Sequence, residues 1–205
     1  MHDGDDSHFY LRKGFRVVAV EADPDVCRAT AERFPSFLET GQLKIVNRAI
    51  APARGPVTFH RSQTSGWGTI VDAWARANAA QCVSSEAIVV EGITLADLVG
   101  EHGDAFYMKL DIEGMDRRAL QSLAGTTVRP KYVSMETSFA RDPSFDAVQA
   151  DFDVLSDIGY DRFKIVDQTK VPQQVPPDPP LSGDHVPIRF TSDASGLFGE
   201  ESPGP

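Results

Sequence analysis

FYMKLDIEG, at residues 106–114, is the stretch of sequence that decides the expected fold. It begins as a short apolar strand, reaches the acids Asp111 and Glu113, and turns at Gly114 before a helical pattern over residues 116–123. A short apolar run followed at once by a turn and a helix is typical of a strand in a parallel sheet covered by helices. The stretch therefore predicts an α/β protein.

The same order of strand, turn and helix recurs along the chain. Residues 16–21, RVVAVE, suit a strand buried on both faces, and Asp23 with Pro24 marks the start of the next helix. Further strands are expected at residues 44–49, 88–90, 132–136 and 163–166. Residues 57–69 are expected to form a less regular excursion that could serve as a lid or substrate wall. Alternating strands and helices imply right-handed crossovers and a mostly parallel, doubly wound sheet.

Three of the expected strands end in an acid, and these acids are Glu21, Asp111 and Glu136. Ligands of such sheets bind at the carboxyl ends of the strands, so the acids should lie along the binding edge. A carboxylate that ends the second strand of a doubly wound fold accepts hydrogen bonds from ribose hydroxyls, and Glu21 fits that role. The alternative is that Glu21 is a solvated strand end.

The segment HDGDDS at residues 2–7 helps to distinguish between two adenosine-containing cofactors, NAD and S-adenosylmethionine. NAD needs a G-x-G-x-x-G turn that lets the backbone approach a pyrophosphate, and acids in that position would repel one. Acids tolerate the sulfonium and ammonium groups of S-adenosylmethionine, whose positive charge favours nearby carboxylates. The segment therefore favours S-adenosylmethionine, and the alternative is a frayed acidic terminus.

Five segments together resemble the FkbM-type methyltransferases in order and spacing. They are residues 4–6, 17–24, 47–50, 107–114 and 130–136. The resemblance covers roughly residues 2–167, and its most distinctive part is the K-x-D-x-E-G block from Lys109 to Gly114. It implies a Rossmann-like class I fold and an S-adenosylmethionine-dependent methyltransferase, typically an O-methyltransferase that acts on a hydroxyl of a sugar or other small metabolite.

The resemblance also implies a role for individual residues. It places Gly4 and Asp5 beside the methionine moiety of the cofactor, Glu21 on the ribose, Ala22 in the cofactor site, Asn47 and Ala49 near the adenine, and Asp111 facing the reaction centre.

The start of the chain departs from the family pattern. Family members have an apolar strand ending in Asp-x-Gly just before the segment that matches residues 1–6, so the central strand of the sheet is expected to be missing here. We therefore expect Met1 to be an internal methionine of a longer natural product. We also expect a methyltransferase domain over residues 1–170 and a Pro- and Gly-rich tail over residues 171–205, whose end, residues 195–205, is either disordered or a flap packed over the site.

Methyl transfer needs alignment of the reactants and a base that takes the proton of the acceptor. Asp111 is the first candidate for the base or for orienting the acceptor, followed by Glu113, Glu136 and His60. Asp111 and Glu113 are two residues apart, which in an extended strand puts both on one side. They could hold a divalent cation, but a pair of acids alone does not establish a metal site, and we expect none. Capping of the following helix is the alternative role of Glu113.

Composition excludes several other classes of protein. A net charge of -10 argues against nucleic-acid binding, and Cys27 and Cys82 lack metal-site spacing. We find no targeting signal or membrane-spanning run and expect a cytoplasmic enzyme whose partner is a small-molecule acceptor. The identity of the acceptor and the oligomeric state are left open. An NAD-dependent oxidoreductase and a non-catalytic, degenerate methyltransferase fold are the rival interpretations.

Overall fold

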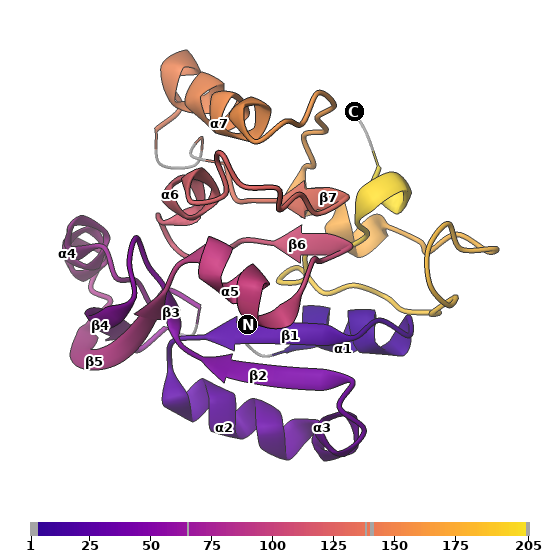
Figure 1. Ribbon diagram of the computed structural model, residues 1–205, viewed down its shortest axis with the longest axis horizontal. Coiled ribbons are helices and arrows are strands. Elements are labelled where there is room, and N and C mark those ends of the chain that lie inside the picture. The colour runs from indigo at the N-terminus through magenta and orange to yellow at the C-terminus, as the bar shows by residue number, and fades with distance from the viewer. Residues whose placement is uncertain (1–3, 65, 138, 140–141, 204–205) are drawn as a thin grey trace. The chain divides into compact units, whose positions relative to one another are not determined.

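The computed structural model describes residues 4–64, 66–137, 139 and 142–203 (Figure 1). Residues 2 and 3 of the expected cofactor segment and Ser65 of the expected lid lie outside the described residues. The chain divides into two units, of which unit 1 comprises Met1–Val46 with Lys164–Pro205, and unit 2 comprises Asn47–Phe163. No described helix has the length and apolar character that crossing a bilayer requires.

Unit 1 pairs two strands and covers them with short helices. In chain order its first elements are α1 (Asp5–Arg12), β1 (Val17–Glu21), α2 (Pro24–Arg33), α3 (Pro35–Glu39) and β2 (Leu43–Asn47), whose last residue begins unit 2. β1 and β2 form a two-stranded sheet (Figure 1). The expected start of α2 is confirmed, because the Asp23 side chain accepts a hydrogen bond from the Asp25 amide and Pro24 occupies the first helical position.

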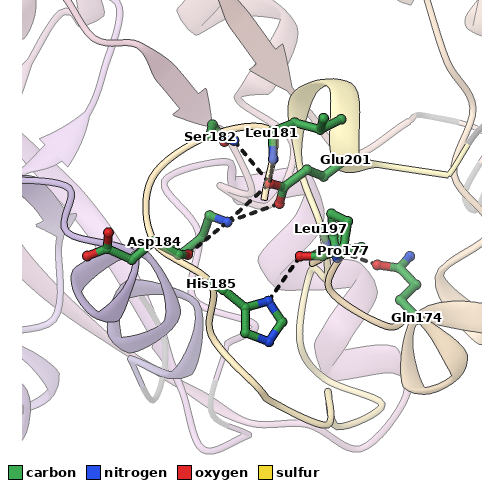
Figure 2. Close-up of polar contacts among 9 residues, drawn as sticks. Gln174, Pro177, Leu181, Ser182, Asp184, His185, Leu197 and Glu201 are labelled. Carbon is green, nitrogen blue, oxygen red and sulfur yellow. Dashed lines mark hydrogen bonds and ion pairs between the residues drawn. The ribbon is translucent and has the colours of Figure 1, made fainter. Parts of the chain in front are cut away.

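The C-terminal segment packs against α1 in unit 1. The ammonium of Lys13, directly after α1, lies 3.1 Å from a carboxylate oxygen of Glu201, and both side chains are only 1% exposed. The amides of Leu181 and Ser182 also donate to Glu201 (Figure 2). Two 3₁₀ helices lie in this segment, η2 (Gln168–Gln173) and η3 (Gly199–Glu201). The described part of the tail is therefore ordered around one buried ion pair.

Unit 2 holds the remaining elements. They are β3 (Ala49–Ile50), β4 (Gly55–Ser62), α4 (Asp72–Ala80), β5 (Ser85–Ile93), α5 (Leu95–His102), β6 (Tyr107–Lys109), α6 (Asp116–Gln121), β7 (Tyr132–Ser134) and α7 (Phe145–Asp157). One sheet has the order β3-β5-β4, with β3 parallel and β4 antiparallel to β5. A second sheet pairs β6 with β7 in parallel.

These elements confirm the α/β class and correct parts of the expected fold. The described strands form three small sheets, and a single doubly wound sheet is not seen among them. The expected irregular excursion begins instead as β4, whose ladder with β5 is antiparallel and the longest in unit 2. Residues 163–166 form no strand, and Ile165 there is 64% exposed. The expected burial of residues 16–21 on both faces is also wrong, because Val18 in the narrow β1-β2 pair is 41% exposed.

One buried carboxyl group begins α6 in unit 2. Asp116 is 5% exposed; its Oδ2 accepts a hydrogen bond from the Ile112 amide, and its Oδ1 has no hydrogen-bond partner among the described residues. Burial raises the pKa of Asp116 to about 6, and the nearby charges of Asp111 and Glu136 act in the same direction. Near neutral pH the carboxyl group is therefore mostly ionised, and its charge destabilises the folded protein relative to a solvated carboxylate.

We expect Glu201→Ala to lower the free energy of unfolding by about 3 to 5 kcal/mol, because it leaves the Lys13 ammonium buried without its carboxylate. Urea unfolding followed by circular dichroism measures the loss. Arg28→Ala is the control, because it removes an ion pair with Asp25 whose side chains are 66% and 53% exposed, and it should cost less than about 1 kcal/mol. Equal losses in the two variants would contradict the structural role of Glu201.

We expect Asp116→Asn to stabilise the protein at pH 8 but not at pH 4. The neutral acid contributes stability that is fully present below the unfolded pKa of about 4 and is lost as the pH rises through about 6. Asparagine mimics the neutral acid, so the gain should grow over that range to at most about 3 kcal/mol. Unfolding of both proteins at several pH values tests this. Asp146→Asn, at the exposed start of α7, should show no such trend.

Candidate functional site

Three of the predicted acids gather beyond the ends of β6 and β7 in unit 2. Oxygen atoms of Asp111, Glu113 and Glu136 all lie within 4.8 Å of one another. The parallel register pairs Lys109 with Ser134, so Asp111 and Glu136 each follow two residues after the last paired position. The structure thus brings together three of the four residues that the sequence analysis named as candidates for the base, and we refer to these three as the acid cluster.

The acid cluster concentrates negative charge at one place on unit 2. The Lys109 ammonium lies 3.2 Å from Oδ2 of Asp111, whose side chain is 47% exposed. The negative charges of Asp111 and Glu136 help to raise the pKa of the buried Asp116 carboxyl group. Such a group can attract a cationic part of a cofactor or hold a divalent cation. The grouping alone does not choose between them, and the expectation of no metal stays a prediction.

Residues from another part of unit 2 contact the turn that carries Glu113 and restrain its backbone. Glu113 has a φ of 49° and Gly114 a φ of 94°, so two successive residues have left-handed backbones. A Cβ on Gly114 would lie 2.4 Å from Cε2 of Trp74, which only glycine avoids. The Thr69 hydroxyl donates a 2.8 Å hydrogen bond to the Glu113 carbonyl. The cap position of α6 is Met115, so Glu113 precedes the cap.

His60, the fourth candidate base, has a partner that the sequence analysis missed. His60 lies on β4, and its Nε2 is 2.8 Å from Oδ1 of Asp72 at the start of α4. The two residues are twelve positions apart and belong to a strand and a helix, so no local pattern marks them as a pair. The two side chains meet only because the chain between β4 and α4 folds back.

The predicted cofactor residues at the start of α1 already have partners in unit 1. Gly4 has a φ of 88°, and a Cβ there would lie 2.8 Å from the Phe34 ring, so the position requires glycine. Asp5 forms a 2.6 Å ion pair with Arg33. Asp6 accepts hydrogen bonds from the backbone and side chain of Ser195 in the tail. A cofactor that contacts these acids would therefore share them with protein groups.

A small hollow borders the same acids. It has a volume of about 90 Å³ and is lined by Asp5, Asp6 and His8 from the α1 region and by tail residues between Ile188 and Ala194. Ligand pockets are generally several times larger, at about 300 to 1,000 Å³. The contribution of the tail was not predicted, because its Pro-rich composition carries no binding pattern.

Glu21 ends β1 as expected. Its side chain is partly buried, and Oε1 accepts a 2.9 Å hydrogen bond from the Asp23 amide, while the Cys27 thiol donates to its backbone carbonyl. The carboxylate is thus oriented by the turn into α2. Its role as the acceptor of ribose hydroxyls stays a prediction. Ala22, the next residue, is 9% exposed.

The two residues expected near the adenine differ in exposure. Asn47 ends β2 and is exposed. Ala49 lies in β3 opposite Gly92 of β5 and is only 3% exposed. Of the pair, Asn47 is therefore the residue whose side chain a ligand can reach in this structure.

A comparison with family models agrees with the resemblance drawn from the sequence segments. A model described as a methyltransferase FkbM domain matches residues 1–162. No curated protein and no solved structure gives a significant match. The matched range contains the acid cluster, Glu21 and His60 but ends before the tail. Because this range covers well over half of its 205 residues, the chain belongs to the FkbM methyltransferase family.

Proposed function

We propose that this protein is an S-adenosylmethionine-dependent O-methyltransferase with the class I fold, acting on a hydroxyl group of a sugar or another small molecule. The observation that carries the proposal is the acid cluster of Asp111, Glu113 and Glu136, found in a chain of a methyltransferase family. Within the proposal Gly4, Asp5, Glu21, Ala22, Asn47 and Ala49 contact the cofactor, together with Asp111.

The charge of the acid cluster supports this choice of methyl donor. When bound, S-adenosylmethionine supplies a methyl group activated by attachment to a positively charged sulfur. Three carboxylates within 4.8 Å of one another provide the negative potential that such a cation favours. The same potential disfavours the pyrophosphate of NAD, and the segment at residues 2–7 has no glycine-rich phosphate turn.

The chemistry of the side chains supports a hydroxyl acceptor. Carboxylates accept hydrogen bonds from hydroxyl groups, and Asp111 is exposed enough to do so. Its role is to orient the acceptor oxygen, because most of the acceleration in methyl transfer comes from alignment. Glu113 and Glu136 contribute the other two carboxylates of the acid cluster, close to Asp111.

Calorimetry on the full chain, first with S-adenosylmethionine and then with NAD, tests the cofactor. Binding of the first alone supports the proposal, and binding of NAD alone supports an oxidoreductase. Release of S-adenosylhomocysteine in the presence of a panel of monosaccharides and small phenols tests the transfer. Binding without turnover on any acceptor would favour the non-catalytic module.

We expect Asp111→Asn to lower kcat by about 100-fold or more while the Kd for S-adenosylmethionine stays within tenfold. The amide keeps the shape of the side chain but loses the charge that orients the acceptor. Steady-state kinetics and calorimetry measure the two quantities. Asp104→Asn, which removes an exposed acid from the loop before β6, should change neither. Full activity of Asp111→Asn would remove this residue from the mechanism.

We expect Glu21→Ala to weaken S-adenosylmethionine binding by about 1 to 3 kcal/mol, because ribose hydroxyls would lose their acceptor. Calorimetry measures the change, and thermal unfolding checks that loss of the hydrogen bond to Asp23 leaves the protein folded. Glu39→Ala, an exposed acid at the end of α3, is the matched control. Unchanged affinity in Glu21→Ala would show that the ribose lies elsewhere.

A further inference from the structure

His60 and Asp72 form a side-chain pair whose geometry fixes the proton on the imidazole ring. Nε2 of His60 lies 2.8 Å from Oδ1 of Asp72. An ionised carboxylate only accepts hydrogen bonds, so Nε2 must be the nitrogen that carries hydrogen. The lone pair of the neutral ring is then on Nδ1, which has no hydrogen-bond partner among the described residues. The pair therefore presents a prepared proton acceptor.

Thr69 connects this pair to the acid cluster. Its backbone exchanges two hydrogen bonds with His60, of 2.8 and 3.2 Å, and its hydroxyl donates to the Glu113 carbonyl. Thr69 is 2% exposed, so this connection is part of the packed interior. One residue thus contacts the backbone of both His60 and Glu113.

The first turn of α4 makes a second connection. Asp72 begins this helix, and Trp74 packs so closely on the Gly114 backbone that a Cβ there would overlap its indole ring. Gly114 directly follows Glu113 of the acid cluster, in the turn beyond β6. The helix that carries Asp72 therefore contacts the turn after Asp111, and the strand that carries His60 is joined to the same turn through Thr69.

The exposure of the two side chains favours a chemical role over a structural one. The His60 side chain is 19% exposed, which leaves it accessible but restrained, whereas Asp72 is 71% exposed. An ion pair with one partner so exposed contributes little to stability. Placement of Asp72 in the first turn of α4 suits the helix dipole, but that does not account for its bond to the ring.

We propose that His60 accepts the proton of the acceptor hydroxyl, and that Asp72 is the positioning residue that orients its ring. This assignment rests on the proposed function. As the acceptor oxygen bonds to the methyl carbon, the carbon–sulfur bond breaks with its electron pair on sulfur, and the hydroxyl proton moves to Nδ1 of His60. The Asp72 carboxylate stabilises the imidazolium that results.

Imidazole suits this task better than the carboxylates nearby. A general base works best when its pKa is near the working pH, and histidine, with an ordinary value of about 6.5, is closer to neutrality than aspartate at about 3.9. Asp111 also has the Lys109 ammonium 3.2 Å away as an ion-pair partner. Asp111 is thus left to orient the hydroxyl while His60 takes its proton.

Kinetics of single variants test the assignment. His60→Gln should lower kcat by about 100-fold or more, with the Kd for S-adenosylmethionine within threefold of wild type. Asp72→Asn should lower kcat by about tenfold, because the imidazole ring loses its fixed orientation. This equals a rise of about 1.4 kcal/mol in the activation free energy. Added imidazole should partly restore turnover to His60→Ala, which a structural role would not allow. Glu86→Gln is the control, because this acid lies on β5 opposite Arg61 and is 72% exposed, much like Asp72.

A readout that needs no turnover accompanies the kinetics. Long-range proton–nitrogen NMR spectra of the uniformly labelled protein should show His60 as the Nε2–H tautomer, and Asp72→Asn should alter that spectrum while Glu86→Gln does not. Wild-type kcat in His60→Gln, or an Nδ1–H tautomer in the wild-type protein, would overturn the assignment. Failure of the wild-type protein to bind S-adenosylmethionine would instead overturn the proposed function, so the two failures are distinguishable.

Discussion

The parallel pairing of β6 with β7 is the constraint on which the candidate site depends. Their register places Lys109 opposite Ser134, so Asp111 and Glu136 continue the same register two residues further on. A slip of one residue would turn every side chain of one strand to the other face and separate the two acids. The pairing is only three residues long, and it is extended by the hydrogen bond from the Leu110 amide to the Ser134 carbonyl. A short ladder thus brings Asp111 and Glu136 of the acid cluster to the same edge.

Carboxylates at such close range repel one another, so packing of the surrounding chain must hold them. Thr69 and Trp74 supply this restraint by contacting the backbone of Glu113 and Gly114, which both have left-handed conformations. Residues in sparsely populated backbone conformations persist only where their surroundings determine them. The raised pKa of the buried Asp116 has a related origin, because burial and the acids nearby both disfavour another negative charge there. The region is therefore arranged for something other than maximal stability, as functional sites commonly are.

Local patterns predicted the parts of this protein that local forces determine. Asp23 with Pro24 predicted the start of α2. The acids after two of the strands predicted the acid cluster, because the carboxyl ends of parallel strands lie at the same edge of a sheet. The division into three small sheets was not predictable, since strand pairing depends on partners far away in the chain. The Lys13–Glu201 pair joins residues 188 positions apart, and the His60–Asp72 bond joins a strand to the following helix. Contacts of that kind have no periodicity or spacing that a single sequence reveals.

The charge balance of the reaction links the proposed methyl transfer from S-adenosylmethionine to the proposed role of His60 as proton acceptor. Methyl transfer turns a cationic sulfonium into a neutral thioether, so an acid cluster facing only the sulfur would stabilise the reactants more than the products and slow the chemical step. If the departing proton reaches His60, a positive charge appears on the imidazole as the one on sulfur disappears. The His60 backbone is hydrogen-bonded to Thr69, whose hydroxyl bonds to the Glu113 carbonyl, so the new charge arises on a strand joined to the turn of the acid cluster, with Asp72 as its direct partner. The acid cluster can then stabilise the site before and after transfer, and a neutral thioether is left with little electrostatic reason to stay bound.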